Sequence, residues 1–401
     1  SGVIRADTSG SVTNTGIVYA RGDAHLTTRG NVVNAGAIAA QGNTTIVATG
    51  STSVIDSQSG SLLGAGIRSD GTLDGSGSVR LTASGRLDAR GQNLAGADFS
   101  ASGAALSLAG SQTVARDISL IASTGELDAS HATLFAAQTL TGRAGATLRT
   151  DDATISADRL SLSAYDLSNR NGQLVQTGTG SASIVAEGVL DNTAGTIAAS
   201  GAMTMRAGTF DNREHGQVMA GGDAELRVAT LVNTGGSLTA GGSLDVRAPG
   251  RVDNAAGLIA ATQNVSIEGD VIDNTDGRVG SLLGAASVLA TTGHLSNAAG
   301  RIEAAQSVTL ASNGLTNTDG VVASGGVRID TRAQRLDNSR GAIVARGALN
   351  VNSAALANDG GTIQAAGALS VDTHGHTLSN THSGATGGIL GQSTVTLQTG
   401  G

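Results

Sequence analysis

The tripeptide Arg21-Gly22-Asp23 is the feature of this sequence that most resembles a site for chemistry. In integrin ligands a tripeptide of this type presents a guanidinium and a carboxylate on opposite sides of a glycine turn, and the carboxylate completes a metal site on the receptor. The tripeptide aligns with Gln41-Gly42-Asn43, 20 residues later, at a point where one strand ends and the next begins. We therefore predict that Arg21, Gly22 and Asp23 form an exposed cell-attachment site. The alternative is an ordinary polar corner, because chance alone yields roughly 0.2 such tripeptides in a chain of this composition.

Arginines that recur at equivalent points of successive repeats form a second group. Guanidinium groups at strand spacing hold sulfate groups well, so these residues are candidate glycan contacts. The candidates are Arg206, Arg227, Arg247, Arg278 and Arg301. However, Glu225 and Asp245 lie two residues before two of them, which on a strand is the same face. The alternative is therefore a solvated face with weak ion pairs.

Histidines are dense only near the end of the sequence. Asp372, His374 and His376 alternate as if on one strand face, with His382 nearby. A zinc site would require that face and a further ligand. Because exposed histidines are common, we predict no metal site and no cofactor.

Catalytic groups are poorly represented. Asp70 and Asp74 lie in the glycine-rich segment Gly64–Gly77, where a loop would position them badly for acid–base work. No phosphate-binding loop, zinc-protease motif or nucleophile elbow is present in the sequence. We therefore predict that the chain has no catalytic residues and is not an enzyme. A polysaccharide-degrading enzyme is the alternative that we considered.

Composition narrows the classes of partner. The 401 residues include 60 Gly, 1 Pro, no Cys and no Trp, and all 24 basic residues are Arg. The net charge of −8 is spread along the chain, which disfavours nucleic acid as a partner. No apolar run approaches the ~18 residues that span a bilayer. Small aliphatic residues suit a narrow interior that is filled repeatedly by the same shapes.

An internal repeat dominates the sequence. From Leu167 onward the chain follows the pattern L-x-N-x-x-G-x-I-x-A, and then a glycine turn leads into alternating apolar residues. The repeated asparagines are spaced by 20 to 23 residues: Asn169, Asn192, Asn212, Asn233, Asn254, Asn274, Asn297, Asn317, Asn338, Asn358 and Asn380. Apolar residues alternate with period two, which indicates strands. Stacked asparagine amides can hydrogen-bond from coil to coil, and we expect the glycines to supply corner conformations that other residues avoid.

The repeat predicts an all-β parallel β-helix solenoid of about 18 coils of 19–23 residues. We interpret residues 1–401 as one continuous β-helix, and as a fragment of a longer protein. Its predicted stretches are regular coils at 1–53, an irregular coil with an insertion at 54–86, Asn-poor coils at 87–166 and Asn-containing coils at 167–401. In the Asn-poor stretch the period is carried by Leu87, Leu108, Leu127, Leu148 and Leu167.

The L-x-N-x-x-G-x-I-x-A-x-G repeats resemble those of the filamentous haemagglutinins, which are large exoproteins of two-partner secretion in Gram-negative bacteria. The resemblance covers Val12–Thr49 and Leu167–Gly400 in full, and Leu87–Asp166 through period and apolar pattern alone. It implies a right-handed β-helix that is exported through an outer-membrane barrel to the bacterial surface and secreted. Similar repeats form the shafts of contact-dependent inhibition toxins.

Two functions follow from these expectations. The first is an adhesin shaft that attaches to host cells through integrins, by its Arg-Gly-Asp tripeptide, or through sulfated or other glycans. The second is a passive β-helical spacer of a contact-dependent inhibition toxin or another large exoprotein, which presents a distal effector.

Overall fold

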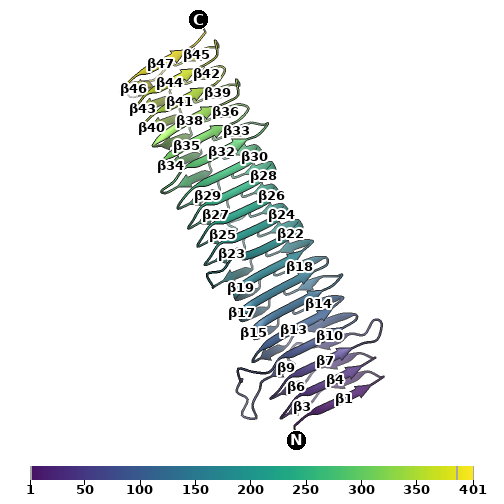
Figure 1. Ribbon diagram of the computed structural model, residues 1–401. Coiled ribbons are helices and arrows are strands. Elements are labelled where there is room, and N and C mark those ends of the chain that lie inside the picture. The colour runs from purple at the N-terminus through teal and green to yellow at the C-terminus, as the bar shows by residue number, and fades with distance from the viewer. Residues whose placement is uncertain (1, 385–386, 401) are drawn as a thin grey trace. The chain divides into compact units, whose positions relative to one another are not determined.

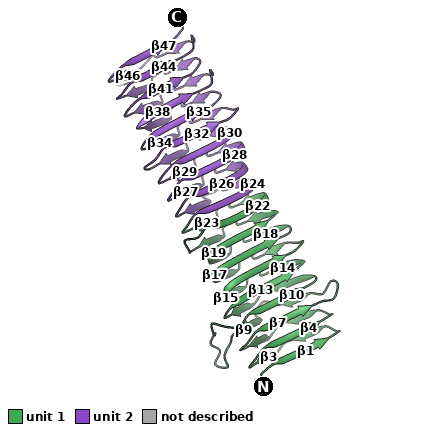
Figure 2. Cartoon of the chain, in the orientation of Figure 1, with its two compact units in different colours: residues 1–201 green, residues 202–401 purple. Residues whose placement is uncertain are grey.

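The structure is a computed structural model that describes residues 2–384 and 387–400. Its described residues form strands and turns, without any helix, in a parallel β-solenoid of about 18 turns (Figure 1). The all-β solenoid prediction is therefore confirmed. The chain divides into two compact units, residues 1–201 and 202–401 (Figure 2). Each unit is described by itself below.

Each coil of unit 1 passes through three faces. On the first face lie β1 (Ile4–Thr8), β4 (Ala24–Thr28), β7 (Thr44–Ala48), β10 (Val79–Ala83) and β13 (Asp98–Gly103). On the second lie β2 (Val12–Asn14), β5 (Val32–Asn34), β8 (Ile55–Ser57), β11 (Arg86–Ala89), β14 (Ala105–Ser107), β16 (Leu127–Asp128), β18 (Thr147–Arg149) and β20 (Asp166–Ser168). On the third lie β3 (Ile17–Ala20), β6 (Ala37–Ala40), β9 (Leu62–Ala65), β12 (Gln92–Ala95), β21 (Gln173–Gln176) and β23 (Thr196–Ala199). Four long strands cross a corner: β15 (Gln112–Ala122), β17 (Thr133–Ala144), β19 (Thr154–Ala164) and β22 (Ala182–Asp191).

Unit 2 repeats this plan. Its long strands run from the first face into the second: β24 (Met203–Asp211), β26 (Ala224–Val232), β28 (Leu244–Asp253) and β30 (Val265–Asp273). The first face continues with β32 (Ala286–Ala290), β35 (Ser307–Ala311), β38 (Gly326–Asp330), β41 (Leu349–Asn352), β44 (Leu369–Asp372) and β47 (Val395–Gln398). The second has β33 (Leu295–Ser296), β36 (Leu315–Thr316), β39 (Leu336–Asp337), β42 (Leu356–Ala357) and β45 (Leu378–Ser379). The third has β25 (Gln217–Ala220), β27 (Ser237–Ala240), β29 (Leu258–Ala261), β31 (Arg278–Ser281), β34 (Arg301–Ala304), β37 (Val321–Ser324), β40 (Ala342–Ala345), β43 (Thr362–Ala365) and β46 (Gly388–Gly391).

Alternation along each strand separates core from surface. In β26, Ala224, Leu226 and Val228 are buried, while Glu225 and Arg227 face outward. Each strand pairs in parallel with the strand one coil away, as β26 does with β28, so that Leu226 stacks on Val246. Like residues thus lie above one another, and a single apolar position in the repeat becomes a column of the core.

An asparagine ladder follows the corner between the second and third faces. In unit 2 the Nδ2 of each asparagine donates to the Oδ1 of the next at 2.6 to 2.8 Å, from Asn212 through to Asn380. Unit 1 has the same bond from Asn14 to Asn34, at 2.8 Å, and from Asn169 to Asn192, at 2.7 Å. The ladder asparagines from Asn169 to Asn358 are buried. Because their amides are hydrogen-bonded there, each bond adds about 1 kcal/mol of stability.

The turn after each ladder asparagine corrects our expectation for the glycines. The left-handed backbone falls one residue before the repeated glycine, for example at Ala256, where φ is 52°. The repeated glycine is required for space instead, because a Cβ at Gly257 would lie 2.2 Å from the carbonyl oxygen of Asn233 in the preceding coil. Contacts this close are excluded for any side chain, so the repeat needs glycine wherever one coil crosses the asparagine carbonyl of another.

One local prediction also needs correction. The leucine column of unit 1 passes through Leu106 and not Leu108, because Leu106 pairs with both Leu87 and Leu127. The two leucines alternate with a polar residue and both are buried, so the sequence pattern does not distinguish them. The extra residues of the irregular coil form a loop between the end of β9 at Ala65 and the start of β10 at Val79 (Figure 1).

Candidate functional site

The tripeptide Arg21-Gly22-Asp23 forms the corner between β3 on the third face and β4 on the first. Arg21 and Asp23 are exposed, as the sequence predicted. The backbone is tied to the next coil, since Gly42 N–H donates to the Gly22 carbonyl at 2.9 Å. The tripeptide therefore belongs to a tight stacked corner and not to a projecting loop.

The Asp23 carboxylate has a structural role in this corner. Its Oδ1 accepts a hydrogen bond from the backbone N–H of Asn43, in the next coil, at 2.7 Å. Asn43 repeats the role, because its Oδ1 accepts from the Ser78 N–H at 2.9 Å. In unit 2, Asp223 Oδ1 accepts from the Ser243 N–H at 2.7 Å at the same kind of corner, where no arginine precedes the glycine. An aspartate here thus needs no receptor to explain it.

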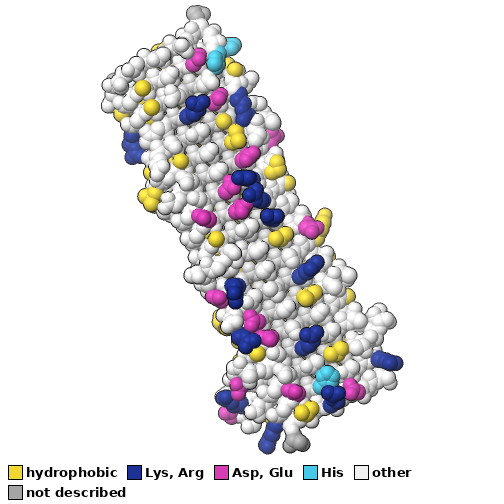
Figure 3. Space-filling model, in the orientation of Figure 1, with side chains coloured by type: hydrophobic (Ala, Val, Ile, Leu, Met, Phe, Trp, Pro, Cys, Tyr) yellow, Lys and Arg dark blue, Asp and Glu magenta, His cyan; other side chains and the backbone are white. Residues whose placement is uncertain are grey.

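The first arginine column lies on the first face of unit 2. Arg206 pairs in register with Arg227, and Arg227 with Arg247, so the three side chains are neighbours. Arg227 forms an ion pair with Glu225, and Arg247 Nε lies 3.2 Å from Asp245 Oδ2. Figure 3 shows the same intermixing of basic and acidic side chains on the face in view. Glu268 is the register partner of Arg247 in the next coil, so the three arginines of the column lie beside three acidic side chains.

The second arginine pair lies on the third face of unit 2. Arg278 and Arg301 are register partners and share the carboxylate of Glu303, at 3.4 and 2.6 Å. The hydrogen bond from Arg301 lowers the pKa of Glu303 against the opposing effect of burial, and the charge of Arg278 adds to it. The pair thus has one unit of excess positive charge. Binding of a glycan by either arginine group stays a prediction.

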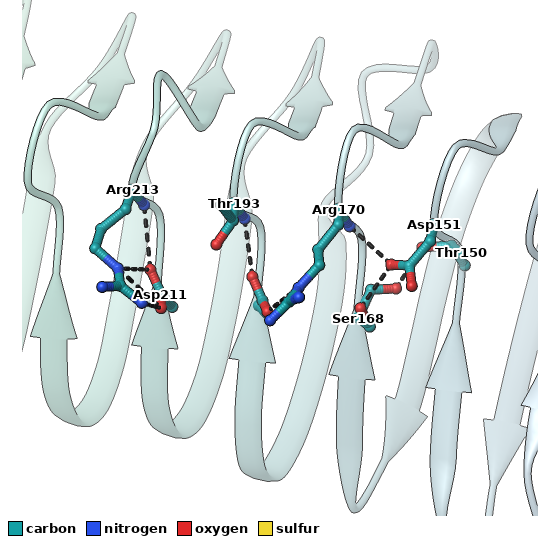
Figure 4. A network of polar contacts seen from close by, with 8 residues as sticks. Thr150, Asp151, Ser168, Arg170, Thr193, Asp211 and Arg213 are labelled. Carbon is teal, nitrogen blue, oxygen red and sulfur yellow. Dashed lines mark hydrogen bonds and ion pairs between the residues drawn. The ribbon is translucent and has the colours of Figure 1, made fainter.

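Ion pairs of this kind also tie the coils of unit 1 together. Arg170 Nε lies 2.5 Å from Asp191 Oδ2 in the next coil. The backbone N–H of Arg170 also donates to Asp151 Oδ1 at 2.9 Å, and Ser168 donates to the same oxygen at 2.6 Å (Figure 4). These contacts are stabilising features of the repeat.

The histidine group does not form the strand face that its spacing indicated. The strand β44 ends at Asp372, and His374 lies in a turn with φ of 49°. The turn is closed by the His376 N–H, which donates to the Thr373 carbonyl at 2.9 Å. Within residues 2–384 and 387–400, no group of three or more His, Cys, Asp or Glu side chains is arranged to hold a metal ion.

A groove on the third face of unit 2 was missed by the sequence reasoning. It has a volume of about 580 Å³ and a floor that includes Ala260, Gly280 and Ala323. Its wall includes Leu282, whose side chain is 69% exposed, beside Leu283 at 54%. Two leucines at a corner that is otherwise small or polar were the signal in the sequence.

Comparison with known protein families decides the classification. The family model for the haemagglutinin repeat matches residues 1–56, 47–91, 64–131, 108–194, 177–248, 239–298 and 277–372. The chain belongs to the haemagglutinin repeat family. The resemblance to the filamentous haemagglutinins is thereby confirmed.

A curated relative is the toxin CdiA of Yersinia pestis, which is 36% identical over 171 residues. The match covers 43% of this chain and 5% of the length of that protein. No solved structure matches the chain. Among the residues that the structure describes, no helix is long and apolar enough to cross a membrane.

Proposed function

We propose that this chain is part of the shaft of a large bacterial exoprotein, exported through an outer-membrane barrel to the cell surface or beyond, and that it is not catalytic. The observation that carries the proposal is the asparagine ladder of unit 2. Eight successive Nδ2–Oδ1 bonds with nearly constant length hold one coil above another without interruption. Such a stack gives length and stiffness from one repeated unit.

Membership of the haemagglutinin repeat family supports export, and the match to a toxin supports a role in presenting another part of a longer chain. The toxin match covers a small share of that protein, so toxin activity itself is not proposed for this chain. A shaft fits because the outward residues of unit 2 are mostly small, polar or ion-paired, with no described cluster of catalytic type.

Attachment to host cells through Arg21-Gly22-Asp23 is the second candidate. The exposure of Arg21 and Asp23 at a corner favours it. The corner role of Asp23 weakens it, because one carboxylate oxygen is already hydrogen-bonded to the Asn43 N–H. Sulfated glycans at the arginine groups are a related possibility for the same class of function.

The test measures attachment of integrin-bearing mammalian cells to the immobilised chain. The variant is Asp23→Asn, which keeps the Oδ1 acceptor, as Asn43 does at its own corner, and removes the carboxylate. Asp223→Asn is the matched control, because it makes the same change at a corner that lacks the arginine. A passive shaft predicts no attachment above the bare surface for all three proteins.

Attachment that is lost in Asp23→Asn and kept in Asp223→Asn would establish the tripeptide as a working site. Equal attachment by all three proteins would exclude the tripeptide as the attachment site. It would also exclude a purely passive shaft. The arginine groups would then be tested by competition with dextran sulfate, with Arg206→Gln as the first variant. Circular dichroism of each variant verifies that the solenoid is intact.

A further inference from the structure

The groove on the third face of unit 2 is an opening over a glycine. Gly280 is the third residue of β31, and its register partner in the preceding coil is Ala260. A Cβ at Gly280 would meet no atom within 4 Å. In the next coil its register partner is Glu303, which also lines the groove. The floor at Ala260, Gly280 and Ala323 is therefore backbone and methyl groups interrupted by one carboxylate, and Leu282 rises beside it as an exposed apolar wall.

Unit 1 contains the same floor in a covered form. Gly64 is the third residue of β9, and its register partner in the preceding coil is Ala39. A Cβ at Gly64 would lie 2.2 Å from Cδ1 of Ile67, a residue of the loop that follows β9. Ile67 is 8% exposed and Ala39 is 5% exposed. One glycine floor is thus filled by an aliphatic side chain, and the other is not.

The segment that fills the floor in unit 1 is a small hairpin. Ile67 and Leu73 form an antiparallel bridge, and the Arg68 N–H donates to the Thr72 carbonyl at 2.9 Å. The Tyr19 hydroxyl donates to the Ile67 carbonyl at 3.0 Å and fixes the hairpin on the third face. The hairpin also carries Asp70 and an ion pair in which Arg68 Nη2 lies 3.0 Å from Asp74 Oδ2, so its aliphatic side chain is presented with one unit of excess negative charge.

Charges around the groove of unit 2 complement such a segment. Arg278 and Arg301 share the single carboxylate of Glu303. Arg346 lines the groove and donates from Nη2 to the Ala305 carbonyl at 2.9 Å. Within the described part of the chain Arg346 forms no ion pair with an acidic side chain. Positive charge therefore exceeds negative charge around the groove, and its apolar surface is the part formed by Ala260, Gly280 and Ala323.

We infer that the Gly280 groove is a docking site for a hairpin loop of a partner protein, which inserts an aliphatic side chain over Gly280 and places carboxylates beside the arginines. The packing of Ile67 over Gly64 shows what the floor accepts. The charge excess of the rim selects an acidic loop over a basic one. This site is independent of the Arg-Gly-Asp corner and of any attachment to cells.

The probe is a fluorescently labelled cyclic peptide with the sequence of Gly64–Gly77, and its binding to the full chain is followed by fluorescence anisotropy. The groove is filled by Gly280→Leu, whose Cβ has space in the folded chain. Ala198→Leu is the control, because it adds the same side chain at the same position of another third-face strand, β23. We expect saturable binding that weakens at least tenfold in Gly280→Leu and is unchanged in Ala198→Leu.

A second peptide carries Ile67→Asp and is expected not to bind, and added salt is expected to weaken binding of the first. Arg346→Glu provides a second variant of the chain, which reverses rim charge without touching the floor and should also weaken binding at least tenfold. Absence of saturable binding to the unsubstituted chain would overturn the inference. The inference would also be overturned if Gly280→Leu and Arg346→Glu both bound the peptide with the affinity of the unsubstituted chain.

Discussion

Replacement of Asn254 by aspartate tests the asparagine ladder at its centre. Asn254 is 1% exposed. Its Nδ2 donates to Asn274 Oδ1 at 2.7 Å and to the Gly257 carbonyl at 3.2 Å, while its Oδ1 accepts from Asn233 Nδ2 at 2.7 Å. Aspartate keeps the acceptor and turns the donor into a second acceptor. Two oxygens then face each other at hydrogen-bond distance in the core of the turn.

The size of the effect follows from the groups that are left unpaired. Asn274 Oδ1 loses its donor, whereas the Gly257 carbonyl keeps the Arg278 N–H at 2.8 Å. A buried group without a partner costs about 1–3 kcal/mol. We therefore expect Asn254→Asp to lower the free energy of unfolding by at least roughly 1–3 kcal/mol at pH 7. A buried, uncompensated carboxylate costs more than this, so burial and repulsion raise the pKa of the new aspartate.

Because the pKa of the new aspartate is raised, the loss of stability in Asn254→Asp depends on pH. The folded state binds the proton more tightly than the unfolded state, so stability of the variant falls as pH rises above the unfolded pKa of about 3.9. Near pH 4 and below, the protonated side chain again has an O–H that donates to Asn274 Oδ1. The variant should therefore approach the unsubstituted chain in acid and diverge from it toward neutrality.

Urea unfolding followed by circular dichroism at pH 4 and pH 7 measures the difference. Asn264→Asp is the matched control, because Asn264 is exposed and uses only its Oδ1, which accepts from the Ala285 N–H at 3.0 Å. Asp223 already fills a corner of this kind. Equal losses in the two variants, or a loss in Asn254→Asp that does not change with pH, would refute the ladder as a source of stability.

Three further predictions concern the same turn and one ion pair. Ala256→Gly should raise the free energy of unfolding in urea by about 1 kcal/mol, because a left-handed φ of 52° disfavours a side chain; a lower value would contradict the assignment of strain. Gly257→Ala should lower it by about 3 kcal/mol, since the new Cβ meets the Asn233 carbonyl; a neutral result would show that the coils can separate locally. Glu303→Gln should flatten the acid side of the stability profile between pH 3 and 7. Arg301 lowers the pKa of Glu303 from 4.5, so the stability that this carboxylate contributes is present above that value and is lost as pH falls through the folded pKa; an unchanged profile would contradict this.

The solenoid was predictable because its signals are periodic. Asparagines at intervals of 20 to 23 residues and apolar residues with period two specify stacked parallel strands before any single contact is known. The bond between Asn14 and Asn34 shows that the coils nearest the start form the ladder as well. A single repeat can be aligned in more than one way, but many successive repeats agree on one alignment. A residue type that recurs at the same point of each repeat can therefore be assigned to one column of the solenoid.

Details that occur once were not predictable in the same way. The choice between Leu106 and Leu108 depends on which residue pairs with Leu87, and both fit the apolar pattern. His374 fits a strand by its spacing but lies in a turn, because β44 ends two residues earlier. In each case the strand boundary is decided by the neighbouring coil, which a reading of local alternation does not include.

One pentapeptide shows how far the neighbouring coil overrides local sequence. Ser-Leu-Leu-Gly-Ala occurs at Ser61–Ala65 and again at Ser281–Ala285. In the first copy the two leucines belong to β9 on the third face, and Leu63 is fully buried. In the second copy β31 ends at Ser281, and both leucines lie exposed at the corner beside the groove. The same pentapeptide therefore contributes a leucine to the core of unit 1 and two exposed leucines to the side of the groove in unit 2.

The same reasoning applies to the Arg-Gly-Asp tripeptide, whose meaning depends on its place in the coil. Three corner residues, Asp23, Asp223 and Asn264, use one side-chain oxygen to accept the N–H of the next coil. The aspartate and glycine of the tripeptide are thus accounted for by stacking, and what distinguishes this corner is Arg21. An adhesive role requires that Asp23 bind a receptor metal while it keeps the Asn43 N–H. Asp23→Asn separates the two demands, because it preserves the hydrogen bond of the corner and removes the charge that a metal needs.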